Sequence, residues 1–229
     1  FLITMKPYLY GGIVARLTNI KNVISVVSGL GYLFSSYRIK NLFLKGCVSY
    51  LFKLAFRNKN QHIIFQNTVD KKIVLNLGVS SQVNTTVIKG AGVDLNKFNP
   101  LLPKNKIPTI LFASRLIKEK GIYEFVKAAK YIFERNIKSK FVVLGDFDYS
   151  NPSCISKEEI DYWQAKNIIE FLGYRRDISL MLSKCHIFCL PSYYGEGMPK
   201  VLLEAAAAGR AVITTTNPGC REAILENKT

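Results

Sequence analysis

Two acidic residues in a stretch of small and apolar residues are the first candidates for chemistry. Glu196 lies in a polar loop after an apolar run, and Glu204 follows eight positions later in a predicted helix. A carboxylate accepts several hydrogen bonds, which suits the paired hydroxyl groups of a ribose or a hexose. The predicted helix begins at Pro199, a residue favoured at the first helical position. Its first N–H groups favour a phosphate or a sugar hydroxyl, and Gly197 would let the backbone approach a ligand closely.

Two cations follow an earlier apolar run. Arg115 and Lys120 lie in the loop after the predicted strand 109–113, before a glycine that begins the next helix. Cations at the carboxyl end of a parallel strand are well placed to hold a diphosphate. A nucleoside diphosphate gains negative charge as its bond to a sugar breaks, and fixed cations that meet this charge lower the barrier. Lys118 and Glu119, between the two cations, are expected to be solvated.

The elements that must position these residues predict an α/β fold with mostly parallel sheets. Short β-branched runs alternate with longer helical stretches, which is typical of that class. Residues 96–107 break the alternation with two prolines among Asn and Lys and are interpreted as a linker. We therefore expect two βα domains facing each other across a cleft, at residues 1–95 and 108–229. The predicted strands are 22–28, 62–65, 85–88, 109–113, 141–144, 168–171, 186–190 and 211–214, and the predicted helices are 38–57, 70–77, 122–135, 158–166, 177–183 and 199–208.

The first predicted strand gives a weaker candidate site. Residues 22–28 form a continuous apolar, β-branched run, as expected for a strand buried on both faces. The run ends at Gly29 and Gly31, and the carboxyl ends of such strands are where open α/β sheets place ligands. The two glycines are consistent with an acceptor site or with a simple turn.

Charge is unevenly distributed along the chain. The formal net charge is +16, and residues 1–69 contain no Asp or Glu. This asymmetry predicts an anionic partner such as nucleic acid, phospholipid headgroups or a phosphorylated substrate, unless the proteome is simply rich in lysine. The predicted helix 38–57 has one narrow polar stripe on an otherwise apolar surface. It could lie on an anionic membrane, or it could be clamped inside the domain with its lysines at the rim.

A metal site and a membrane span are not indicated by the sequence. The five cysteines are scattered, and the two histidines, His62 and His186, open apolar strands where a structural role is expected. No apolar run reaches the roughly 18 residues that a transmembrane helix needs.

These motifs together resemble the retaining glycosyltransferases of family 4, which have the GT-B fold of two Rossmann-like domains. The resemblance rests on Arg115-Leu116 with Lys120-Gly121, and on the paired acids in EGMPKVLLEAAAAG. Residues 90–94 resemble the segment that closes the first domain of that family. Residues 4–16, 27–34 and 217–224 resemble bacterial members that build polysaccharide or O-antigen units. The family begins with a strand and a glycine-rich loop and ends with a helix that crosses back, so a fragment truncated at both ends is expected.

The resemblance also implies roles for individual residues. Arg115 and Lys120 would bind the donor diphosphate and stabilise its departure, and Glu204 would hold the ribose hydroxyls. Glu196 would hold the transferred sugar, together with backbone amides near Gly197. The implied catalytic residues are Arg115, Lys120 and Glu196, and the implied donor-binding residues are Glu204, Gly197, Met198, Pro199, Gly173 and Tyr174. The family retains anomeric configuration and needs no metal or other cofactor.

The implied function is transfer of a sugar from a nucleotide-sugar, with UDP as the expected nucleotide, to a lipid-linked or polysaccharide acceptor. The expected location is peripheral, on the cytoplasmic face of the cell membrane. Three alternatives stay open. A sugar-nucleotide epimerase would need acids in the first domain, where residues 1–69 have none. A nucleic-acid-binding protein would fit the charge, but the aromatic residues fall in apolar runs, so no nucleic acid partner is expected. The third is a non-catalytic remnant.

Overall fold

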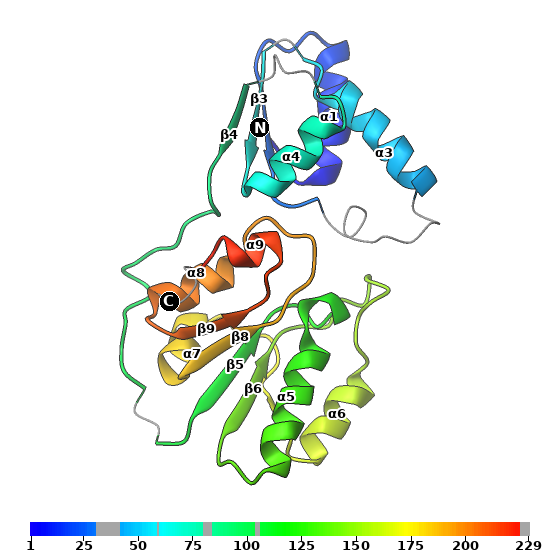
Figure 1. Ribbon diagram of the computed structural model, residues 1–229. Coiled ribbons are helices and arrows are strands. Elements are labelled where there is room, and N and C mark those ends of the chain that lie inside the picture. Colours follow the sequence, from blue (N-terminus) through cyan, green and yellow to red (C-terminus); the bar gives the residue numbers. More distant parts are fainter. Residues whose placement is uncertain (31–41, 59, 80–83, 104–105, 225–229) are drawn as a thin grey trace. The chain divides into compact units, whose positions relative to one another are not determined.

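The computed structural model describes residues 1–30, 42–58, 60–79, 84–103 and 106–224 (Figure 1). Contacts between Cα atoms divide the chain into two compact units. The first unit contains Phe1–Ala91 and Tyr194–Pro199, and the second contains Gly92–Tyr193 and Lys200–Thr229.

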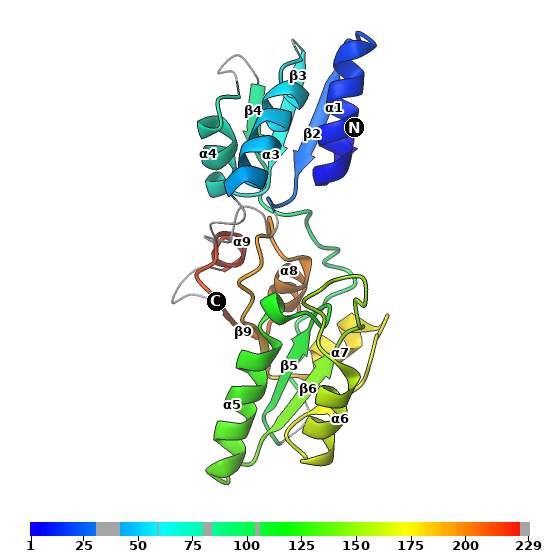
Figure 2. The same cartoon turned by 90° about the vertical axis from the view of Figure 1, so that its right-hand side faces the viewer.

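The first unit is a parallel sheet with helices on one face. Its strands, in the order β1-β2-β3-β4, are β1 (Leu2–Ile3), β2 (Val23–Val27), β3 (Gln61–Phe65) and β4 (Asn84–Val87). Its helices are α1 (Met5–Leu17), α3 (Leu42–Ala55) and α4 (Thr68–Asn76). Each crossover advances in the same direction along the sheet, so the right-handed rule puts the helices on one face, as Figures 1 and 2 show.

The core of the first unit lies between the sheet and these helices. Tyr8 of α1 contacts the rings of Phe52 and Phe56 from the end of α3, with ring centroids 5.6 and 5.5 Å apart. All three side chains have no exposed surface. This end of α3 therefore belongs to the protein interior, so part of the apolar surface that suggested a membrane-bound helix is packed within the unit. Residues 38–41 of that predicted helix lie outside the described residues.

The sequence suggested that strand β2 is buried on both faces, but only one face of it is fully buried. Val23, Ser25 and Val27 are buried, whereas Ile24 and Val26 between them are half-buried. Strand β3 has the same alternation. The physical reason is that the described helices cover one face of the sheet, and successive side chains point to opposite faces.

The second unit is a doubly wound sheet. Its parallel strands, in the order β7-β6-β5-β8-β9, are β5 (Thr109–Ala113), β6 (Lys140–Leu144), β7 (Glu170–Phe171), β8 (Ile187–Leu190) and β9 (Ala211–Thr214). Its helices are α5 (Ile122–Glu134), α6 (Lys157–Ala165), α7 (Ile178–Lys184), α8 (Lys200–Ala207) and α9 (Pro218–Arg221), with a 3₁₀ turn, η2 (Lys118–Lys120). Helices α5 and α6 cover one face and α7 and α8 the other (Figures 1 and 2).

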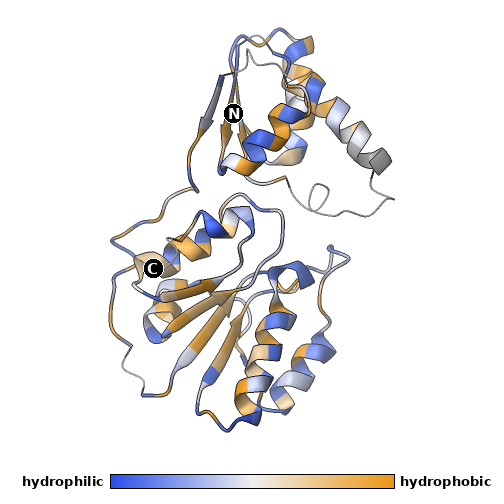
Figure 3. Cartoon of the chain, in the orientation of Figure 1, coloured by the Kyte–Doolittle hydropathy of each residue, from blue (hydrophilic) through white to orange (hydrophobic). Residues whose placement is uncertain are grey.

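Burial and topology of this sheet decide where a ligand can bind. Its central strands are mostly hydrophobic (Figure 3), and their side chains form one core with α5, α6 and α8. The chain order runs outward from β5 to β7 and then returns to β8 on the other side of β5. Open α/β sheets bind ligands at the carboxyl ends of strands beside such a reversal. The predicted α/β fold with two parallel sheets is confirmed.

The segment interpreted as a linker has no helix or strand in its described residues. Phe98 is nevertheless buried in the core of the second unit. Arg210 is also buried, and its guanidinium donates hydrogen bonds to the carbonyls of Cys185, Ala208 and Leu101. These contacts attach residues 98–101 to the second unit.

Candidate functional site

A cavity of about 330 Å³ lies at the carboxyl edge of the second sheet. Its walls come from the ends of β5 and β6 and the residues after them, from the residues after β7, and from α7 and α8. The lining residues are Ala113, Ser114, Arg115, Leu144, Gly145, Asp146, Tyr174, Arg175, Ile178, Val201 and Glu204. Three residues selected from the sequence, Arg115, Tyr174 and Glu204, therefore line one cavity.

Arg115 is held at the rim of this cavity by an ion pair. Its Nη1 lies 2.7 Å from Oδ2 of Asp148, and half of its side-chain surface is exposed (51%). The hydrogen bond from Ser150 is the largest cause that lowers the pKa of Asp148 below its usual value. Burial opposes this shift, and the hydrogen bond and charge of Arg115 add to the lowering. The exposed guanidinium remains within reach of a ligand, and an Arg fork suits the oxygens of a phosphate.

Glu204 lies in the second turn of α8 with only 9% of its surface exposed. Its Oε1 lies 3.5 Å from Nζ of Lys200, one helical turn earlier. That pair is weak, because Lys200 is mostly exposed and a Lys placed before a Glu at this spacing is the less favourable order. A nearly buried carboxylate beside a cavity is suited to accept hydrogen bonds from ligand hydroxyls.

Lys120 occupies a different environment from Arg115. It ends η2, is 8% exposed, and is not among the residues that line the cavity. Its neighbour Glu119 is not solvated as expected. One carboxylate oxygen of Glu119 accepts a hydrogen bond from Ser153 Oγ at 2.7 Å, and the other is buried without a partner among the described residues. The Glu119 side chain lies in the interior because the backbone carbonyl of Glu119 accepts a hydrogen bond from the Tyr193 amide. This hydrogen bond packs the turn η2 against the segment that follows β8.

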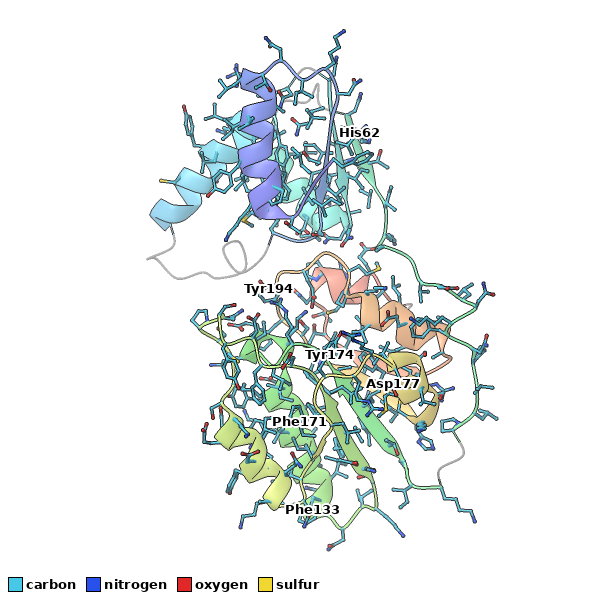
Figure 4. All side chains as sticks on the ribbon, turned by 180° about the vertical axis from the view of Figure 1, so that it is seen from behind. His62, Phe133, Phe171, Tyr174, Asp177 and Tyr194 are labelled. Atoms are coloured by element: carbon cyan, nitrogen blue, oxygen red, sulfur yellow. The ribbon has the colours of Figure 1, made fainter. Side chains whose placement is uncertain are left out.

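Tyr174 follows β7 and is 66% exposed (Figure 4). The preceding Gly173 has φ +66°, and its carbonyl accepts a hydrogen bond from the Gly145 amide at 3.0 Å. The next residue, Arg175, also lines the cavity and makes two hydrogen bonds, 2.9 and 2.7 Å long, with the carboxylate of Asp177. The sequence analysis did not select Arg175 or Asp148. Arg175 could have been selected because it directly follows Gly173 and Tyr174, the residues expected beside the base.

The other expected donor residues, Glu196 to Pro199, belong by their contacts to the first unit. Gly197 donates its amide to the Ser28 carbonyl at 3.0 Å, and the Met198 amide donates to Oε1 of Gln66 at 3.2 Å. A Cβ on Gly197 would lie 2.2 Å from that same Gln66 atom. The close approach expected of Gly197 is thus made to a protein side chain. Met198 and Pro199 are buried, and α8 begins at Lys200 rather than at Pro199.

Gly29 has a similarly tight position. Its φ is +117°, and a Cβ there would lie 2.7 Å from both the Glu196 Cα and the Gly197 nitrogen. This glycine is required by backbone packing, whether or not it also contacts an acceptor. Gly31, the second expected acceptor residue, lies outside the described residues.

A buried pair of polar side chains, Asn67 and Asp70, lies next to the Gly197 segment. Asn67 is fully buried and caps α4 by accepting the Asp70 amide on Oδ1 at 2.7 Å. Its Nδ2 donates to Asp70 Oδ2 at 2.8 Å and to the Gly197 carbonyl at 3.3 Å. Burial raises the pKa of Asp70 from 3.8 to about 6, although the hydrogen bond from Asn67 opposes the shift.

The raised pKa of Asp70 predicts a pH-dependent stability. Between about pH 4 and 6 the native state keeps a proton that the unfolded state releases, so the free energy of unfolding falls as the pH rises, by about 3 kcal/mol in total. We expect Asp70→Asn to remove this fall in urea unfolding measured across that range. Asp161→Asn, at an exposed position of α6, is the control and should behave as the wild type. If the free energy of unfolding changed with pH in the same way for Asp70→Asn and the wild type, the raised pKa would not belong to Asp70.

Among the described residues, no group of three or more His, Cys, Asp or Glu side chains could hold a metal ion. His62 and His186 make structural contacts, with Thr86 Oγ1 at 2.9 Å and with the Thr109 amide at 3.1 Å, respectively. A search over the same part of the chain finds no helix whose length and apolar character would let it span a membrane.

The sequence is similar to a known protein family and to several glycosyltransferases. The family model for Glycosyl transferases group 1 matches residues 94–229. The N,N'-diacetylbacillosaminyl-diphospho-undecaprenol alpha-1,3-N-acetylgalactosaminyltransferase of Campylobacter jejuni is 33% identical over 96% of this chain and 59% of its own length. The UDP-Gal:alpha-D-GlcNAc-diphosphoundecaprenol alpha-1,3-galactosyltransferase of Escherichia coli is 29% identical over 93% of this chain and 56% of its own.

Solved structures agree on the fold. The structure of Anabaena Alr3699/HepE in complex with UDP superposes with a TM-score of 0.74 at 18% identity, covering 99% of this chain and 63% of that one. The chain described here thus spans less than two thirds of the length of these three proteins. With a family model matched over more than half of its residues, and with the parallel sheets of the GT-B fold, this chain belongs to the group 1 glycosyltransferases, also called family 4.

Proposed function

We propose that the chain is part of a retaining glycosyltransferase that moves a sugar from a UDP-sugar to a lipid-linked or polysaccharide acceptor. The observation that carries the proposal is the cavity in which Arg115, Tyr174 and Glu204 meet at the carboxyl edge of the second sheet. The names of the two relatives, which specify diphospho-undecaprenol acceptors and, in one case, a UDP-sugar, support the substrate classes.

The roles follow from chemistry and position. Glu204 accepts the ribose hydroxyls, Tyr174 lies beside the base, and Arg115 binds the diphosphate and stabilises the charge that develops on it as the sugar leaves. Lys120 assists from the end of the same loop. Glu196 holds the transferred sugar, without any metal ion, while the amides of Gly197 and Met198 keep their hydrogen bonds to Ser28 and Gln66. We place residues 1–95 on the acceptor side, 96–107 between the domains, and the nucleotide-sugar site in 108–229.

The proposed location is the cytoplasmic face of the cell membrane, with peripheral attachment. Two observations support it. The acceptors in the names of the relatives are lipid-linked, and residues 1–69 carry no acidic side chain that would repel anionic headgroups. Any membrane contact of α3 would use the face that carries the exposed Tyr50, because Phe52 and Phe56 are buried.

Calorimetric titration with UDP, GDP and ADP tests the donor class. We expect saturable binding of UDP in preference to the other two nucleotides. We further expect Arg115→Met to weaken UDP binding roughly 10- to 150-fold, because a charge-assisted hydrogen bond contributes about 1.5–3 kcal/mol, and to weaken uridine binding much less. Lys127→Met, at an exposed position of α5, changes the net charge equally and is the control. Equal losses for UDP and uridine would contradict the diphosphate role of Arg115.

A further inference from the structure

The segment around Gly197 is attached to the first unit through specific polar contacts. Its backbone donates to the Ser28 carbonyl after β2 and to the Gln66 side chain after β3, and it accepts a hydrogen bond from Asn67. Backbone groups of two successive residues, Gly197 and Met198, are therefore fixed by three different residues of the first unit. The residue immediately before them is Glu196.

Helix capping does not account for these contacts. Capping of α4 uses only Oδ1 of Asn67, which accepts the Asp70 amide. The two N–H groups of the same side-chain amide are directed to the Asp70 carboxylate and to the Gly197 carbonyl. Gln66 precedes the cap and contributes an acceptor to the Met198 amide. Because Asn67 is fully buried and hydrogen-bonded at both ends of its amide group, its orientation is fixed.

Steric fit makes the arrangement specific. The Gln66 side chain occupies the space that a Cβ on Gly197 would fill, at 2.2 Å from its Oε1 and 2.9 Å from its Cβ. A segment that must approach a side chain this closely has few alternative conformations. Its conformation therefore depends on the side chains of Gln66 and Asn67 as well as on its own sequence.

We propose that Gln66 and Asn67 are positioning residues for the Glu196–Met198 segment, which they hold in the conformation that binds the transferred sugar. The proposal rests on the proposed function of that segment and adds two residues to which no role has so far been assigned. Neither residue is required to contact the sugar. Each acts through the backbone of Gly197 or Met198.

Amide hydrogen exchange with residue-level mass spectrometry tests the contact itself. Gln66→Met keeps the size of the side chain but removes the acceptor, and Gln66→Glu restores an acceptor. Asn67→Ser keeps a good helix cap for α4 but is too short to reach the Gly197 carbonyl. We expect exchange at Gly197 and Met198 to be about fivefold faster in Gln66→Met and Asn67→Ser, as for the loss of one hydrogen bond. Gln66→Glu should match the wild type, and amides of β2 and β3 should stay protected in every variant.

Calorimetry with UDP and UDP-galactose tests the consequence for the donor. Gln66→Met and Asn67→Ser should each bind UDP-galactose about fivefold more weakly than the wild type, as expected for one lost hydrogen bond. Both should bind UDP as the wild type does, so the ratio of the two affinities falls. Unchanged exchange would overturn the positioning role. Faster exchange with an unchanged affinity ratio would overturn the link to the sugar. If the wild type bound neither nucleotide, the proposed function would fail, and the exchange measurement would still decide whether Gln66 and Asn67 hold the segment.

Discussion

Replacing Glu204 with Gln is expected to weaken UDP binding by at least tenfold. The carboxylate is 9% exposed at the edge of the cavity, so a ligand hydroxyl that binds it is shielded from competing water. A hydrogen bond to such a charged group contributes about 1.5–3 kcal/mol, which corresponds to roughly 10- to 150-fold in affinity. Glutamine keeps the size of the side chain but replaces one acceptor oxygen with a donor. Titration calorimetry with UDP measures the change directly.

The assignment to the ribose can be isolated with a second ligand. UDP that lacks both ribose hydroxyls should bind the wild type as weakly as UDP binds Glu204→Gln, and the same variant should no longer discriminate between the two ligands. This double cycle removes effects of the substitution on the rest of the cavity. Glu134→Gln, at an exposed position at the end of α5, is the matched control and should leave both affinities unchanged. Continued discrimination by Glu204→Gln would assign the hydroxyls to another residue.

Gly121→Ala is expected to cause a large loss of stability in the second unit. This glycine has φ +83°, and a Cβ there would lie 2.2 Å from the Pro191 carbonyl oxygen. A left-handed conformation costs a non-glycine residue about 1–2 kcal/mol, and overpacking adds about 1–3 kcal/mol. We therefore expect a loss of roughly 2–5 kcal/mol in the free energy of unfolding. Urea unfolding followed through the single tryptophan, Trp163 of α6, reports on this unit.

Gly92→Ala separates the two contributions. Gly92 has φ +75°, but no atom lies within 4 Å of the position that its Cβ would take. Its replacement should therefore cost only the conformational part, about 1–2 kcal/mol. Similar losses for the two variants would show that the chain around Pro191 relaxes and that the close backbone contact has little energetic weight.

Much of the second unit could be predicted from sequence because its signals are local. The strands β5 and β9 begin and end where the apolar runs do. Helix α5 ends one residue earlier than predicted, and α6 begins and ends one residue earlier than predicted. Strand β7 is the exception. Residues 168–171 were expected to be extended, but only Glu170 and Phe171 pair with β6, so apolar character alone did not determine its length.

Helix α1 could not be predicted because tertiary contacts decide it. The sequence of Met5–Leu17 contains Pro7, Gly11 and Gly12, which all lower helix propensity. Pro7 lies in the first turn, where the missing N–H is tolerated. A Cβ on Gly12 would lie 2.6 Å from the Ala55 carbonyl, so this glycine allows α1 to approach the end of α3 closely. Sequence alone does not reveal that neighbour.

The candidate site divides in a similar way. Arg115 and Glu204 were found from local patterns, because Arg115 follows a predicted strand and Glu204 lies in the second turn of a predicted helix, whereas Tyr174 was implied by the family resemblance; all three line one cavity. Asp148 and Arg175 were missed because their significance comes from ion pairs and from walls built by separate loops. The tight position of Gly197 against Gln66 joins residues 131 positions apart in the chain, a relation that no local pattern contains.

In the second unit, some residues that line the cavity are separate from the residues that form the core. This separation allows the ligand preference to change during evolution without loss of the fold. Tyr174 and Arg175 line the cavity from an exposed loop, whereas Phe112, Val143 and Phe188 of the strands beneath are fully buried. Substitutions at exposed positions usually change stability by less than about 0.5 kcal/mol. On the proposed role of Tyr174 beside the base, preference for a different nucleoside base can therefore evolve by successive changes after β7, each nearly neutral for folding, while the sheet that carries them stays unchanged.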